Sequence, residues 1–306
     1  ITESKNPLKE TFKELVGLTP FGLVGSDNFK KELSINIIFT VLIFLASYYL
    51  YVLTGDFLQW TAFGIGVYVI CNWIHGLKNR DPVAFLLIFK SKALLLGLLS
   101  FPFITFVTYA LGAFGPSFYI RNFSMTATEV GIIYGLITVF GSMIGVICGG
   151  ILGDKLRETY VNGKLYLIMA SAVLTGVTAI GFIHSENLVA SFTWKFVYHI
   201  ASTAWLGCAA STVTELVLPR LRAVASAFFI LMLSMIGLAL GPYLTGMVSD
   251  IYINSGLLPG PALKNAMTLT LVVLVLPFGL LAVACKYLKN DEAEIYEKAR
   301  SLGEEI

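Results

Sequence analysis

Residues 141–164 read GSMIGVICGGILGDKLRETYVNGK, and this stretch decides the fold. Glycine recurs at every fourth position, at Gly141, Gly145, Gly149 and Gly153. On a helix this spacing places the four glycines on one face. A face without side chains lets a second helix approach closely, as small-residue faces do in membranes. The stretch predicts a membrane helix that packs through glycine and ends at a charged turn in water.

The composition of the whole chain is that of an integral membrane protein. Of its 306 residues, 57% are hydrophobic and 13% are charged, and the mean hydropathy is +0.80. A soluble domain carries about 25% charged residues. Basic runs with interleaved aromatic residues are absent outside the apolar segments, which argues against nucleic-acid binding. The four cysteines have no C-x-x-C spacing and the three histidines are scattered, so neither a metal site nor a cofactor is predicted.

Apolar segments near the ~20 residues that a bilayer core requires predict eight transmembrane helices. They lie at residues 34–54, 57–76, 92–113, 127–151, 164–183, 189–217, 222–249 and 266–287. With the N-terminal segment inside, all but three of the 21 Lys and Arg residues fall on the inner side; the exceptions are Arg121, Lys195 and Lys264. This asymmetry predicts a multi-pass protein of a bacterial inner (plasma) membrane with both termini in the cytoplasm.

Several motifs resemble those of the major facilitator superfamily. Residues 150–155, GILGDK, match the G-x-L-x-D-[KR] core of its loop motif. The residues after Lys155 lack the glycine that often follows, which fits the weaker copy in the family's second half. Residues 215–222, ELVLPRLR, resemble the junction between the tenth and eleventh helices. Residues 106–116 and 222–250 are similar to the seventh and eleventh helices of the spinster-like branch.

The resemblance implies that residues 92–287 form the C-terminal six-helix bundle of an all-α polytopic transporter. Residues 1–33 would then be a cytoplasmic linker with a short amphipathic helix near residues 8–17. Residues 34–76 would form an extra helix pair, residues 77–91 a cytoplasmic loop, and residues 288–306 a cytoplasmic tail. Because the family has six further helices, the resemblance also implies an N-terminal half upstream of Ile1, missing from this sequence.

The implied function is secondary transport of a small organic or amphipathic, lipid-like solute by alternating access. Protons or another ion are candidates for coupling. Polar groups near mid-membrane are costly without a purpose, and they give the substrate-cavity candidates Tyr109, Tyr134, His199 and Trp205. The alternative for His199 is a plain hydrogen bond to a neighbouring side chain.

Charged residues at the inner ends of the helices are candidates for a cytoplasmic gate latch. They are Asp154, Lys155, Arg157, Glu215 and Arg222. The alternative is that these charges only fix the topology. Glycine and proline inside spans weaken helices locally; the packing and hinge candidates are Gly141, Gly145, Gly149, Gly153, Gly241 and Pro242.

Two other function classes remain open. A non-transporting membrane sensor or assembly subunit would carry the same spans. An intramembrane enzyme would need paired acids, H-E-x-x-H or G-x-S-x-G within the spans, and the sequence has none of these. We therefore expect a protein without enzymatic activity.

Overall fold

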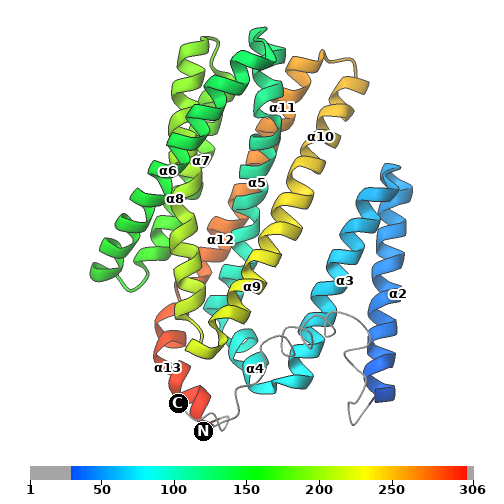
Figure 1. The fold of residues 1–306 in the computed structure, drawn as a ribbon, viewed down its shortest axis with the longest axis vertical. Helices are drawn as coiled ribbons and strands as arrows, with labels where there is room; N and C mark the ends of the chain where they lie inside the picture. Colours follow the sequence, from blue (N-terminus) through cyan, green and yellow to red (C-terminus); the bar gives the residue numbers. More distant parts are fainter. Residues whose placement is uncertain (1–28, 302–306) are drawn as a thin grey trace. The chain divides into compact units, whose positions relative to one another are not determined.

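The computed structural model describes residues 29–301, and over this range every regular element is helical (Figure 1). The predicted short helix near residues 8–17 lies outside the described residues. The chain divides into two compact units, one ending at Leu87 and the other running from Ile88 to Ser301.

The first unit is an antiparallel helix pair. Helix α2 (Phe29–Thr54) turns into α3 (Phe57–Arg80), and α4 (Pro82–Lys90) follows. The turn uses Gly55, whose φ of 82° favours glycine. Helix α2 begins within the predicted linker, at Phe29. Its first turn is charged and extends the helix on the N-terminal side of the apolar segment. The predicted loop at residues 77–91 is also largely helical.

A polar seam joins α2 to α3. The Asn36 amide donates to Asn72 Oδ1 at 2.6 Å, and the Tyr68 hydroxyl donates to Asn36 Oδ1 at 3.1 Å. His75 contacts the Glu32 carboxylate one turn further along. Because polar groups in an apolar medium need partners, the seam fixes the register of the two helices.

The second unit holds the remaining helices. They are α5 (Lys92–Phe123), α6 (Ala127–Thr159), α7 (Gly163–His184), α8 (Leu188–Glu215), α9 (Arg222–Met232), α10 (Ala239–Asn254), α11 (Pro259–Thr270), α12 (Val275–Ala284) and α13 (Leu288–Ser301). Short segments complete it: the 3₁₀ turns η2 (Pro219–Leu221) and η4 (Leu271–Leu274) and the π-helical η3 (Leu233–Leu238).

Within this unit the helices pack as two groups. Helix α8 packs mainly against α6 and α7, whereas α5 packs mainly against η3, α10, α11 and α12 (Figure 1). Segments α9–η3–α10 and α11–η4–α12 each run on as one long helical span. Six long helical spans therefore make up the second unit before α13.

Seven helical segments in the described part of the chain are long and apolar enough to cross a membrane. Helix α8 has 28 residues but is not among the seven. Its Lys195 and His199 and its several hydroxyl side chains make it less apolar, and its buried face lies against protein. The all-α polytopic membrane fold is confirmed. Seven of the eight predicted spans are both long enough and apolar enough to cross a membrane.

The four glycines of α6 lie directly against α8. A Cβ on each would lie 2.7 Å from His199 Cβ (Gly141), 2.4 Å from Ile200 O (Gly145), 2.0 Å from Ala204 O (Gly149) and 2.1 Å from Cys208 Sγ (Gly153). Real Cβ atoms do not approach other atoms so closely. The close contact of these two helices therefore depends on the absence of side chains on this face of α6.

Candidate functional site

An ion cluster joins the ends of three helices. Lys164, at the start of α7, hydrogen-bonds to the Glu215 carboxylate at the end of α8, and its Nζ lies 3.8 Å from Asp154 Oδ1 on α6. Lys164 is only 7% exposed. Its ammonium can therefore hold α6, α7 and α8 together at one end of the bundle.

The local chain path explains why Lys164 lies there. A Cβ on Gly163 would lie 2.3 Å from the Leu156 carbonyl, so the turn after α6 runs back against its own helix. Lys164 follows at once and is carried toward Asp154. From the sequence, Lys164 was counted only as a charge on the inner side. The glycine that precedes it was an available signal of the tight turn that places it near Asp154.

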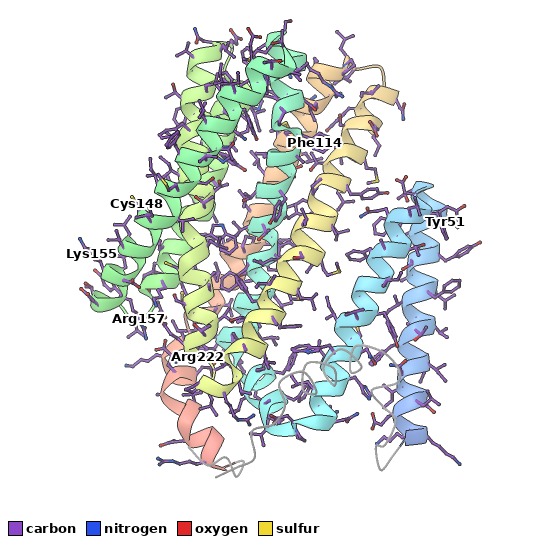
Figure 2. All side chains as sticks on the ribbon, viewed as in Figure 1. Tyr51, Phe114, Cys148, Lys155, Arg157 and Arg222 are labelled. Atoms are coloured by element: carbon purple, nitrogen blue, oxygen red, sulfur yellow. The ribbon has the colours of Figure 1, made fainter. Side chains whose placement is uncertain are left out.

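The other latch candidates make separate contacts. Arg157 Nη2 lies 2.6 Å from Glu292 Oε2 on α13, and Arg222 Nε donates to the Thr214 carbonyl at 3.2 Å. Lys155 is exposed at the end of α6. Figure 2 shows Lys155 and Arg157 at that end of α6 and Arg222 near the start of α9. Of the five latch candidates, only Asp154 and Glu215 contact a common partner in the described part of the chain, Lys164.

Three of the four cavity candidates are buried with their polar atoms bonded inside the bundle. The Tyr134 hydroxyl donates to Gly112 O at 3.3 Å, and His199 Nε2 lies 3.1 Å from Thr138 Oγ1. The Trp205 indole donates to Ser202 O at 3.0 Å and stacks on Phe101. The side chains of Tyr134, His199 and Trp205 are thus packed between the helices of the bundle in this conformation.

Tyr109 differs from these three. Its side chain lies on α5 and is 44% exposed. It is the one of the four cavity candidates whose side chain is exposed on the surface of the bundle.

Lys195 was counted from the sequence only as an outer-side charge within the predicted span 189–217. The residue lies inside α8 and is fully buried. Aromatic neighbours Trp194, Phe196 and Tyr198 surround it in the sequence, and such a lone charge within an aromatic segment was the available signal.

Helix α10 approaches α5 closely where its backbone is irregular. A Cβ on Gly241 would lie 2.4 Å from Phe106 O. Pro242 follows and has no N–H to donate to the preceding turn, and η3 lies just before it. Segments of π-helix are frequent at functional sites, so this crossing combines a weakened backbone with tight packing.

Comparisons with known proteins give a consistent family assignment. No protein-family profile matches the chain. It is 30% identical over 201 residues to an MFS-type efflux pump of Mycolicibacterium smegmatis, covering 65% of this chain and 45% of that protein. It is 26% identical over 173 residues to Protein spinster of Drosophila melanogaster, covering 53% of this chain and 28% of that protein. The chain thus spans less than half the length of these two relatives.

A solved structure shares the fold. It is the crystal structure of a bacterial homologue of the human lysosomal transporter Spinster, in an inward-facing, occupied conformation. The TM-score is 0.53 at 22% identity, over 79% of this chain and 58% of that chain. The helical bundle and the sequence matches confirm the resemblance to the major facilitator superfamily. Spinster proteins are among the relatives, which confirms the resemblance to the spinster-like branch inferred from the motifs.

Proposed function

We propose that residues 92–287 act as one six-helix half of a secondary transporter, working by alternating access against a second bundle. The observation that carries the proposal is the 30% identity to an efflux pump over 65% of the chain. The solute is a small organic or amphipathic molecule. Aromatic side chains with few charges line the helices that carry Tyr109, Tyr134 and Trp205, which suits such a solute.

The ion cluster of Asp154, Lys164 and Glu215 serves as the gate latch of this transporter. It lies at the ends of three helices that must move together, and Lys164 is nearly buried. Glu215 is 41% exposed and Asp154 is 76% exposed, so the pair with Glu215 is the less solvated of the two and contributes more to the latch. We place the cluster on the cytoplasmic side of a bacterial inner membrane, because most Lys and Arg residues fall on that side.

Reconstitution in liposomes of the chain together with its second six-helix bundle tests the proposal, with ethidium and a fluorescent single-chain lipid as probes. Replacing Glu215→Gln should lower the transport rate about fivefold with equal protein inserted, because a solvated pair of this kind is worth up to about 1 kcal/mol. Asp154→Asn should have a smaller effect, since its carboxylate is 76% exposed. Glu158→Gln is the matched control, since Glu158 is exposed on the same helix.

The remaining outcomes decide against parts of the proposal. Parallel losses of transport and of inserted protein in Glu215→Gln would mean that the charges only fix the topology. If the wild-type chain, reconstituted with the second bundle and with its inserted amount verified, moves neither probe, a sensor or an assembly subunit becomes the better interpretation.

A further inference from the structure

Helix α8 carries a lysine inside a cage of aromatic rings. The Lys195 side chain is 0% exposed. Its Nζ lies 4.2 Å from the ring centroid of Phe182 on α7, 4.4 Å from that of Tyr198 on α8 and 5.0 Å from that of Tyr134 on α6. We call Tyr134, Phe182 and Tyr198 the aromatic cage; its rings come from all three helices of the α6–α8 group.

The cage does not satisfy an ammonium group. Lysine in its charged form has three N–H donors and no acceptor, and Lys195 Nζ has no hydrogen-bond partner among the described residues. Ring faces attract a cation but replace few of the hydrogen bonds it makes in water. A buried charge without an acceptor or counter-ion is unstable. The closed cage therefore favours the amine over the ammonium.

The groups that face Lys195 offer no counter-ion. Helix α6 contributes Tyr134 and α8 contributes Tyr198 and His199, while Phe182 of α7 does not titrate. From α5, the Tyr119 ring lies 6.2 Å from that of Tyr134. Across residues 29–301, no carboxylate is found in an ion pair with Lys195. Only a movement of the three helices can bring water or an anion to the amine.

We propose that Lys195 is a proton-exchange site. Its nitrogen is the neutral –NH2 amine while α6, α7 and α8 close around it, and the lone pair takes up one proton from solvent to give –NH3⁺ when the cage opens. Only the coupling of this exchange to solute movement rests on the proposed transport function; the exchange itself depends on the packing of this bundle.

Proton counting during unfolding tests the proposal on the chain as it is. Wild type and Lys195→Met are unfolded by heat in a non-ionic detergent at pH 8, in two buffers of different ionisation enthalpy, and the difference in heat gives the protons bound. Unfolding releases Lys195 into water, so the wild type should take up about one proton more than Lys195→Met. Equivalently, its unfolding equilibrium should shift toward the unfolded state about tenfold more per unit fall in pH.

Lys286→Met is the matched control, because it removes an exposed lysine that lies outside the aromatic cage. It should take up as many protons as the wild type. Equal uptake by wild type and Lys195→Met would overturn the proposal, since the lysine then keeps its proton in the cage. Lys195→Gln serves if the Met variant does not fold.

If neither variant folds, nuclear magnetic resonance of wild type labelled with ¹⁵Nζ-lysine decides. One amine signal beside the ammonium signals at pH 8 supports the proposal, and ammonium signals alone overturn it. None of these readouts uses transport. Failure of proton exchange and failure of the transport function are therefore separate results.

Discussion

At the scale of single residues, Gly149 and Gly150 are neighbours in α6 with opposite surroundings. A Cβ on Gly149 would lie 2.0 Å from Ala204 O of α8, whereas a Cβ on Gly150 meets no atom within 4 Å. We expect Gly149→Ala to lower the free energy of unfolding by about 1–3 kcal/mol, because α8 must shift to make room.

The matched variant Gly150→Ala should leave stability unchanged or raise it by up to about 1 kcal/mol, through helix propensity alone. Thermal unfolding in detergent, followed by circular dichroism, measures both. Equal losses in the two variants would mean that the glycine face does not control the packing of α6 on α8.

The sequence was a good guide to residues whose role depends on spacing, and a poor one to buried charges. Gly141, Gly145 and Gly149 could be placed on one face because a helix repeats regularly. Lys164 and Lys195 could not be understood in this way. The surroundings of a charge in an apolar segment depend on the helices that cover it, and the sequence does not show which helices these are.

At the scale of elements, α13 is more than the tail that was predicted. Asp291 accepts hydrogen bonds from Ser91 Oγ at 2.9 Å and Ala93 N at 2.8 Å, so it caps the start of α5 from another helix. Carboxylates stabilise helix N-termini. Glu292 of the same helix holds Arg157 at the end of α6.

We expect Asp291→Ala to destabilise the start of α5 by about 0.5–2 kcal/mol, the usual cost of a lost cap. Hydrogen exchange at the amides of residues 92–95 should quicken accordingly. Lys289→Ala, an exposed change on the same helix, is the control and should leave those amides unaffected. Unchanged exchange in Asp291→Ala would mean that α13 does not support α5.

The predicted helix positions agree with the observed ones better than the helix lengths do. Apolar segments located the spans because a bilayer imposes their length. Helix α5 nevertheless runs to Phe123, beyond Pro116, and α6 runs to Thr159 through its charged turn. Backbone hydrogen bonding continues past the apolar residues, and hydropathy does not report it.

At the scale of the whole molecule, the sequence predicted the distinction between a helix pair and a six-helix bundle from composition and motifs. Glycine, proline and hydroxyl residues concentrate in the bundle, where helices pack on several sides. The pair relies on one polar seam, Asn36 to Asn72. The motifs could not reveal that α8 depends on its neighbours to cover Lys195, because that is a property of three helices together.

Because each unit has its own internal packing, we expect residues 88–306 to fold in a membrane without the first unit. The truncated protein should elute as a single species in detergent and unfold within about 4 °C of the whole chain, the shift that about 1 kcal/mol produces in a domain of this size. A shorter form that starts at residue 127 is the control. It lacks α5, against which α10, α11 and α12 pack, and should aggregate. Aggregation of both forms would mean that the helix pair is required for the bundle to fold.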